Sequence, residues 1–334
     1  MQKTKKKPGA GRTILRVLAL LLALILAFAA FLLLAPLTER GDGSAVERSA
    51  DWMGRLDDGL LLSDINIPGT HDSATQYVQL AWFSKCQFKD IGGQLEAGYR
   101  YLDIRLGADG ERLKLMHGFT SCKSSALGGS LYLDEVLAQC YAFLDEHPSE
   151  AVIFAVKQEH GDETVTAFQT LLNAYISDAP ERWLLTDTIP TLGEARGKLV
   201  LMRRCEDEAG LGAAAGIPLL WPNQNGHEDL SLSTAMTDNG SYRLWVQDRY
   251  EYDAVDKWAA FTAGMAQNGA QPGDIALHFL STKGTAAYGH PFSFARALNP
   301  QLLGYEAPEG GRFGWVVVDF ASAKLAEHIY QSNF

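Results

Sequence analysis

The sequence predicts an α/β fold, an irregular (β/α)8 TIM-type barrel preceded by one N-terminal transmembrane helix. An uncharged run of 21 residues at 17–37 is long enough to cross a bilayer core as a helix. After it, short runs rich in β-branched residues alternate with helical patterns, which favours a parallel sheet with crossover helices. Eight such runs over about 280 residues suit a TIM-type barrel. A doubly wound open sheet would need a glycine-rich phosphate loop after its first strand, and the sequence has none.

The N-terminus has the pattern of a membrane segment. Residues 1–16 carry six basic side chains and no acidic one, and residues 17–37 carry no charge. Positive charge before the apolar run predicts a cytoplasmic N-terminus. A cleaved signal peptide is the alternative, although its apolar region usually has about 7–15 residues. We therefore expect a single-pass signal-anchor in the cell membrane with the rest of the chain outside the cytoplasm, or a secreted protein if the anchor is cleaved.

The chain after residue 37 is acidic. It holds 23 basic and 40 acidic residues, a net charge of −17, which argues against nucleic-acid binding. The whole chain is 47% hydrophobic and 21% charged, values that exclude a disordered protein. Residues 38–55 are polar and predict a tether, and residues 56–334 predict one barrel domain.

The barrel elements follow from apolar periodicity. The expected strands are 64–67, 101–106, 113–116, 151–157, 198–203, 243–247, 275–280 and 315–319. The expected helices are 131–146, 162–176 and 254–267. The segment 107–116 is more typical of a hairpin than of a strand–helix–strand unit, so we expect the barrel to be irregular.

Four cysteines show no spacing typical of a zinc site. Cys140 and Cys205 lie in apolar contexts and are expected to be buried thiols. Cys86 and Cys122 lie in polar contexts, where a disulfide in an oxidising compartment and two free thiols are both compatible with the sequence.

Polar side chains gather where the expected strands end, which is where barrel enzymes place their catalytic residues. They are His71, Asp72, Asp103, Arg105, His117, Lys157, Glu159, Arg204, Asp248, Tyr250 and Asp319. Each alone is compatible with a structural role, such as a hydrogen-bonded core histidine or an Asp–Arg pair. Together they predict a mixed acid–base and anion-binding site. HExxH and GxSxG motifs are missing, which disfavours a zinc protease and a serine hydrolase.

These motifs resemble a known family. PGTHDS at 68–73, QLEAGYRYLDIR at 94–105, MHG at 116–118 and HPSEAVIFAVKQE at 147–159 are similar to the X domain of bacterial phosphatidylinositol-specific phospholipase C. The similarity continues through GKLVLMRR at 197–204, VQDRY at 246–250, HFLSTKGTA at 278–286 and GWVVVDF at 314–320, so it covers the region after the tether. The family fold is an irregular TIM barrel, in agreement with the strand pattern.

The resemblance implies a phosphodiesterase (a phosphorus–oxygen lyase) that cleaves phosphatidylinositol to diacylglycerol and a cyclic inositol phosphate. By motif, His71 would be the general base and His117 the general acid, roles that imidazoles can share near neutral pH. Asp319 would orient His71, and Asp72 would support the acid side. Arg105, oriented by Asp103, would bind the phosphate oxygens. The residues left for the inositol end are Lys157, Arg204, Asp248 and Tyr250, with Glu159 pairing the cations.

The resemblance also predicts metal independence and no cofactor. Calcium-dependent relatives have acidic ligands around the second-strand motif and an Asn after the first histidine, whereas this chain has Asp72 and Arg105. Two alternatives stay open: a metal-dependent glycerophosphodiester phosphodiesterase, and a catalytically silent module that binds an inositol lipid or a glycan. We expect a monomer whose partners are an inositol lipid and the membrane, with the head group unspecified. Tyr77, Trp82 and Phe83 are compatible with a membrane-touching rim and equally with a helix core.

Overall fold

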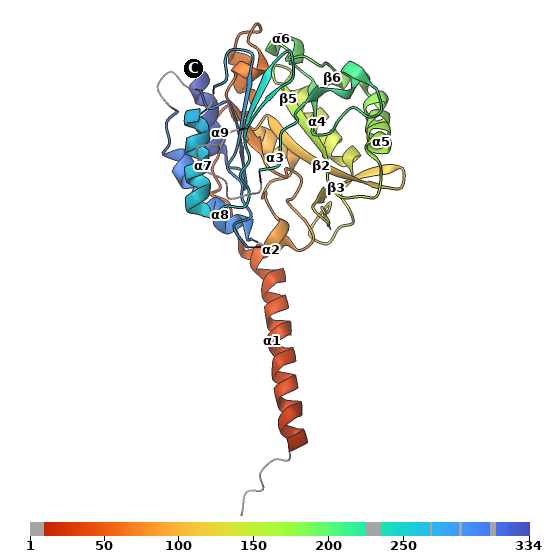
Figure 1. Cartoon of the computed structure of the whole chain (residues 1–334), viewed down its shortest axis with the longest axis vertical. Coiled ribbons are helices and arrows are strands. Elements are labelled where there is room, and N and C mark those ends of the chain that lie inside the picture. The colour runs from red at the N-terminus through yellow and green to blue at the C-terminus, as the bar shows by residue number, and fades with distance from the viewer. Residues whose placement is uncertain (1–9, 225–234, 268, 287–288, 308–311) are drawn as a thin grey trace, which may run out of the picture.

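The computed structural model describes residues 10–224, 235–267, 269–286, 289–307 and 312–334, and Figure 1 shows an α/β domain carried on one long helix. The helices are α1 Ala10–Thr38, α2 Ala81–Ser84, α3 Ile91–Glu96, α4 Leu133–Glu146, α5 Val165–Asp178, α6 Leu192–Ala195, α7 Ala254–Gln267, α8 Pro291–Leu303 and α9 Ala323–Tyr330. The strands are β1 Ile67–Thr70, β2 Tyr101–Asp109, β3 Arg112–His117, β4 Thr120–Ser121, β5 Val152–Gln158, β6 Trp183–Leu184, β7 Leu199–Arg203, β8 Ile217–Pro218, β9 Ala235–Asp238, β10 Arg243–Gln247, β11 Ile275–Phe279 and β12 Trp315–Val318.

Eight parallel strands follow one another in the order β8, β7, β5, β2, β1, β12, β11 and β10. The other four extend this set: β3 and β4 form an antiparallel hairpin on β2, β9 pairs antiparallel with β10, and β6 joins β7. Parallel strands require crossover connections, and α4 to α9 occupy several of them. The result is the expected α/β barrel with a hairpin inserted after its second strand.

The barrel is open between β8 and β9, the strand on the outer edge of β10, where the described residues share no backbone ladder. Side chains cross this gap instead. The Tyr242 hydroxyl donates to the Pro218 carbonyl, and Gln224 Nε2 donates to the Val246 carbonyl at 3.0 Å. Gln224 Oε1 in turn accepts the Asp248 amide at 2.8 Å. These bonds hold the residue after β10, Asp248, at the rim of the barrel.

Two sequence predictions need correction. The first strand is Ile67–Thr70, not 64–67, because Leu62–Asp64 form a 3₁₀ turn and the Pro-Gly pair that suggests a loop lies in the sheet. Gly69 is required there, since an added Cβ would lie 2.9 Å from the Cβ of Tyr101. The segment 113–116 belongs to the antiparallel β3, so the eighth parallel strand is the unpredicted β8.

The expected tether of residues 38–55 is partly core. Ser49–Arg55 form a 3₁₀ helix in which Trp52 and Met53 are buried, and Trp52 stacks on Tyr330 with ring centroids 5.1 Å apart. The buried Glu150 carboxylate accepts the amides of Met53 and Gly54, which ties this segment to the barrel.

Strand β2 shows how the sheet sorts its side chains. Leu102, Ile104 and Leu106 pack in the apolar layer under α4 and α5. Successive side chains of a strand face opposite sides, so Asp103 and Arg105 point to the barrel interior. The outward face of β2 is therefore apolar and buried under the helices. Its inward face carries the charged side chains of Asp103 and Arg105.

Helix α1 covers the expected apolar run of 17–37 and adds about two turns before it. The segment Gly11–Thr38 contains an 18-residue window with a mean hydropathy of 3.2 and is long enough to cross a membrane, as an anchor or as a signal sequence would be. In Figure 1 it projects away from the barrel and ends beside α2.

Candidate active site

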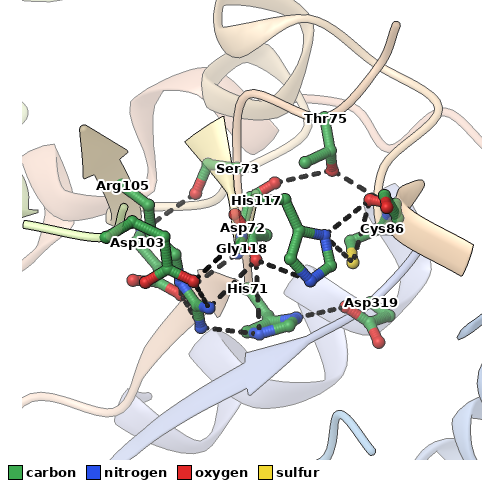
Figure 2. Close-up of polar contacts among 12 residues, drawn as sticks. His71, Asp72, Ser73, Thr75, Cys86, Asp103, Arg105, His117, Gly118 and Asp319 are labelled. Atoms are coloured by element: carbon green, nitrogen blue, oxygen red, sulfur yellow. Dashed lines mark hydrogen bonds and ion pairs between the residues drawn. The ribbon is translucent and has the colours of Figure 1, made fainter. Parts of the chain in front are cut away.

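A cavity of about 330 Å³ opens at the carboxyl ends of the parallel strands. Its lining includes nine residues that the sequence analysis selects, namely His71, Arg105, His117, Lys157, Glu159, Arg204, Asp248, Tyr250 and Asp319. Asp72 and Asp103 are buried directly beneath it. The structure therefore brings the whole predicted set together at one site. Figure 2 shows the part of this site around His71, Arg105 and His117.

His71 and Asp319 are adjacent because β1 and β12 are paired in register. Thr70 lies opposite Val318, so the next residue of each strand leaves the sheet at the same level. The His71 Nδ1 lies 2.8 Å from the Asp319 Oδ1. Burial opposes a charged His71, but the Asp319 carboxylate outweighs it, so the pKa of His71 is raised above its ordinary value.

The contacts of His71 define its tautomer. Its Nε2 lies 2.8 Å from Nη2 of Arg105, and a guanidinium has only donors. Nε2 must therefore accept, which leaves the proton on Nδ1, where it is donated to Asp319. A neutral imidazole held in this form presents a lone pair to the cavity, as a general base requires.

Arg105 is held by three carboxylates. Its Nε donates to Asp103 Oδ2 at 3.1 Å, and its Nη1 lies 3.2 Å from both Asp72 Oδ2 and Glu159 Oε1. These carboxylates raise the pKa of Arg105, although burial opposes its charge. Burial alone would raise the pKa of Asp103, but the nearby Arg105 and His71 outweigh it and lower that pKa to about 2. The guanidinium is thus a fixed positive charge at the base of the cavity.

Asp72 connects the two histidines. Its Oδ2 lies 3.4 Å from His117 Nε2 and 3.7 Å from His71 Nε2. Its backbone has a φ of 44°, a left-handed conformation that Asp tolerates better than most residues, and its amide donates to Asp103 Oδ2. Burial raises the pKa of Asp72 despite the nearby Arg105. A proton can therefore be shared between this carboxyl group and His117.

His117 ends β3 and approaches the cavity from the side opposite His71. Its Nδ1 lies 2.7 Å from the Ser84 carbonyl, which can only accept, so Nδ1 carries a proton and Nε2 faces Asp72. The two imidazole rings are nearly perpendicular, with centroids 6.1 Å apart. Both rings line the same cavity.

The other end of the cavity is a network of charges. Lys157 Nζ lies 2.5 Å from Glu159 Oε2, and Arg204 Nη2 lies 3.8 Å from Asp248 Oδ2. Burial and the charge of Arg105 lower the pKa of Lys157. The Tyr250 hydroxyl donates to Asn223 at 2.9 Å. Such alternating donors and acceptors suit a ligand with many hydroxyl groups.

Several lining residues are not among the predicted site residues. Ser281 and Lys283 follow β11, so the rule of strand ends, applied to 275–280, could have found them. Asn223 lies in a segment without a periodic pattern. Cys86 carries no motif, yet its Sγ lies 3.9 Å from His117 Nδ1 (Figure 2).

All four cysteines are free thiols, so Cys86 and Cys122 form no disulfide. Both are buried rather than placed in exposed loops, whereas Cys205 is only half-buried. Cys140 is buried as expected. Burial and the nearby Asp319 and Asp72 raise the pKa of Cys86 well above its ordinary value.

Potential metal ligands in the described site all involve the Cys86 thiol. One group is His71, Cys86 and Asp319, and the other is Asp72, Cys86 and His117. Neither group is the oxygen-rich set that calcium or magnesium prefers. The carboxylates of Asp72, Asp103 and Glu159 converge on the Arg105 guanidinium instead.

The fold is an α/β barrel whose cavity holds two histidines beside a buried arginine. Residues 65–205 match the model of the family "Phosphatidylinositol-specific phospholipase C, X domain". The 1-phosphatidylinositol phosphodiesterase of Staphylococcus aureus (strain Newman) is 29% identical over 293 residues, which cover 81% of this chain and 88% of the relative. That of Listeria monocytogenes is 26% identical over 299 residues, 84% of each.

Solved structures agree with these sequence relatives. A Staphylococcus aureus phosphatidylinositol-specific phospholipase C mutant superposes with a TM-score of 0.70 at 26% identity, covering 85% of this chain and 98% of that one. The Listeria monocytogenes enzyme has the same fold, with a TM-score of 0.62. This chain therefore belongs to the bacterial family of phospholipases C with an X domain, and it is homologous to the Staphylococcus and Listeria enzymes over most of its length.

Proposed function

We propose that this protein is a phosphatidylinositol-specific phospholipase C that works without a metal ion. The observation that carries the proposal is the arrangement around Arg105, which lies within 3.2 Å of the general-base candidate His71 and of the carboxylate that faces His117. One cation and two imidazoles thus surround a single position for a phosphodiester. Family membership supplies the reaction class, and the substrate of the relatives agrees with it.

The first step forms the new bond to phosphorus. His71 Nε2 accepts the proton of the inositol 2-hydroxyl while that oxygen attacks the phosphorus atom. The developing imidazolium is stabilised by Asp319 through Nδ1. Because Arg105 donates to Nε2 in this structure, substrate entry must redirect its Nη2 toward the phosphate oxygens, where negative charge grows.

The second event breaks the bond between phosphorus and the glycerol oxygen. His117, protonated on both ring nitrogens, donates from Nε2 to the leaving oxygen, and Asp72 stabilises that cation before transfer. The products are diacylglycerol and a cyclic inositol phosphate, and the protons balance because one is taken and one is given. In a second reaction, water can open the cyclic phosphate. His117 then accepts the proton of the attacking water, and His71 returns a proton to the inositol oxygen.

The cavity volume sets the part of the substrate that enters. About 330 Å³ is at the small end of ligand pockets, which suits a head group and leaves the acyl chains outside. Lys157, Glu159, Arg204 and Asp248 would bind the inositol hydroxyls, and Tyr250 would lie against the ring. A glycerophosphodiester phosphodiesterase would need a metal where the Arg105 guanidinium lies.

The location follows from α1. A signal-anchor with a cytoplasmic N-terminus would hold the catalytic barrel outside the cytoplasm, because six basic residues precede the apolar run. Proteolysis of intact cells tests this: the barrel should be degraded from outside, and protection until the membrane is permeabilised would contradict the orientation.

The substrate class is tested with the full chain in detergent micelles. Phosphatidylinositol should release diacylglycerol, whereas phosphatidylcholine and phosphatidylglycerol should not. Phosphatidylcholine lacks a hydroxyl nucleophile next to the phosphoester, and phosphatidylglycerol lacks the inositol ring that the charged end of the cavity would bind. Equal turnover of all three lipids would contradict the mechanism. No turnover of any inositol lipid, combined with measurable binding, would favour the silent binding module.

A further inference from the structure

Only the last turns of α1 touch the barrel. Residues 11–30 are all exposed, whereas Leu32, Ala35, Pro36 and Glu39 are partly or fully buried. Their spacing of i, i+3, i+4 and i+7 places them on one helix face. In Figure 1 the end of α1 lies directly beside α2 at one end of the barrel.

Two contacts join the end of α1 to a stacked pair of rings on the barrel. The Phe31 ring lies 4.9 Å from the Trp82 ring of α2, and Trp82 stacks on His290 with centroids 3.8 Å apart and planes 2° from parallel. His290 Nε2 lies 2.7 Å from Glu39 Oε1, just beyond the end of the helix. The helix is therefore docked by an aromatic pair and a hydrogen bond. Trp82 is part of a docking surface and not of a helix core.

The docking surface is next to the catalytic cavity. Phe83 and Pro291, the neighbours of Trp82 and His290 in the chain, both line the cavity. The Ser84 carbonyl of the same short helix accepts from His117. Trp82 and His290, which hold the end of α1, are thus chain neighbours of residues that line the mouth of the site.

Large apolar side chains are exposed around this mouth. Leu80 precedes α2 and is 50% exposed, and Phe119 follows the cavity residue Gly118 and is 60% exposed. Leu127 is 99% exposed and lies in the loop after β4. The first residue of this loop, Cys122, forms an antiparallel bridge with Val78, two residues before Leu80. Single apolar residues are common on surfaces. These three, however, lie on segments that are connected to α2, the helix against which α1 docks.

The helix length gives the depth of this rim. The apolar run of 17–37 spans about 32 Å at 1.5 Å per residue, close to the bilayer core of about 30 Å. Phe31 lies six residues before its end, about 9 Å below the outer boundary for an upright helix. Amphipathic helices that lie on bilayers insert about 5–10 Å. Trp82 contacts Phe31, so the α2 edge of the barrel reaches a similar depth in the outer leaflet.

We infer that docked α1 holds the catalytic mouth against the outer leaflet of the membrane that α1 spans. The enzyme then takes its lipid from that same leaflet, in cis, and not from a facing membrane. This inference rests on the proposed function, and it names the source of the substrate. The exposed side chains of Leu80, Phe119 and Leu127 form an apolar rim that contacts the lipid surface around the anchor.

The test uses the full chain in vesicles. Vesicles that carry the enzyme contain phosphatidylinositol with deuterated acyl chains, and vesicles without enzyme contain the unlabelled lipid. Mass spectrometry of the diacylglycerol then separates cis from trans turnover in one reaction. The initial cis rate should exceed the trans rate about 100-fold, as expected when a tether raises the local concentration. Equal rates would overturn the inference.

A matched pair of variants separates docking from simple anchoring. Phe31→Ala removes the contact with Trp82 and should lower the cis rate about three- to tenfold. Phe28→Ala removes the same ring from a position of α1 that is 62% exposed, and should leave the rate unchanged. Equal effects of both variants would overturn the docking role.

Detergent micelles provide the reference, because lipid there is presented without a leaflet. Both variants should keep the wild-type turnover in micelles, since neither residue lines the cavity. A wild-type chain that is inactive in micelles as well as in vesicles would contradict the proposed function itself. Activity in micelles with equal cis and trans rates would contradict only the inference about the leaflet.

Discussion

Replacing Asp319 with Asn tests how the site holds its base. The change keeps the shape of the side chain and removes the negative charge 2.8 Å from His71 Nδ1. An amide that turns its NH2 group toward Nδ1 forces the proton onto Nε2, where Arg105 already donates. The imidazole would then lose the lone pair with which it accepts the proton of the nucleophile.

The magnitude follows from the bond that is lost. A hydrogen bond to a charged group contributes about 1.5–3 kcal/mol, and about 1.4 kcal/mol corresponds to a factor of ten. We therefore expect kcat of Asp319→Asn to fall about 10- to 150-fold. KM should change little, because Asp319 contacts the base and not the inositol end of the cavity.

The pH profile gives a second, independent signature. Burial lowers the pKa of His71 and Asp319 is the strongest influence that raises it, so the variant has a lower His71 pKa. A general base works in its neutral form, so activity rises as pH increases through that pKa. The acid limb of kcat/KM against pH should thus move to lower pH in the variant.

The assay is diacylglycerol release from phosphatidylinositol micelles between pH 4 and pH 9. Asp248→Asn is the matched control, since Asp248 lies at the other end of the cavity and contacts Arg204 rather than His71. The control should alter KM and leave the acid limb in place. A near-native kcat with an unmoved acid limb in Asp319→Asn would refute the role of Asp319.

Four further predictions follow from the same contacts. His71→Ala and His117→Ala should each lower kcat by about 10²–10⁴ in the micelle assay, and near-native turnover of either would remove that residue from the acid–base pair. Excess EDTA should leave the rate unchanged, and restoration of a lost rate by calcium would show that Arg105 does not replace a metal. Lys157→Met should raise KM more than it lowers kcat in steady-state kinetics, because Lys157 lies at the inositol end; the reverse pattern would place it at the phosphate. Glu150→Gln should lower the free energy of unfolding by about 3–5 kcal/mol in urea titrations, because it leaves the buried Arg100 without its counter-charge; a loss below about 1 kcal/mol would contradict this.

Alternation and strand ends made much of the site predictable. Asp103 and Arg105 share a face of β2 because they are two residues apart. Residues that follow parallel strands meet at one rim, which is why His71 and Asp319 come together although 248 positions separate them. The pairing of β1 with β12 has no local signal, and it follows instead from the predicted barrel, whose first and last strands are neighbours.

Short and irregular elements were not predictable. Strand β8 has two residues, too few for any periodicity. It supplies the eighth parallel strand of the barrel, a role that the sequence analysis gives to 113–116. Trp52 lies in a polar stretch, and its burial depends on Tyr330 at the far end of the chain. Cys86 reaches His117 only because the loop after α2 folds under the cavity.

The docking of α1 was likewise beyond the sequence. An apolar run predicts a membrane helix, but only the fold shows that Trp82 and His290 meet Glu39 and Phe31 beside the cavity. The two readings of Trp82, a membrane rim or a helix core, could not be separated without that contact. In the structure Trp82 packs against Phe31 and His290, an arrangement that neither interpretation specified.

The central claim is that His71 and His117 convert phosphatidylinositol to a cyclic phosphate with Arg105 in place of a metal ion. The most direct measurement is phosphorus NMR of the full chain acting on phosphatidylinositol in mixed micelles with EDTA present. The account predicts a signal of cyclic inositol phosphate that accumulates before any open inositol phosphate. Direct formation of the open phosphate, or turnover only after calcium is added, would contradict it.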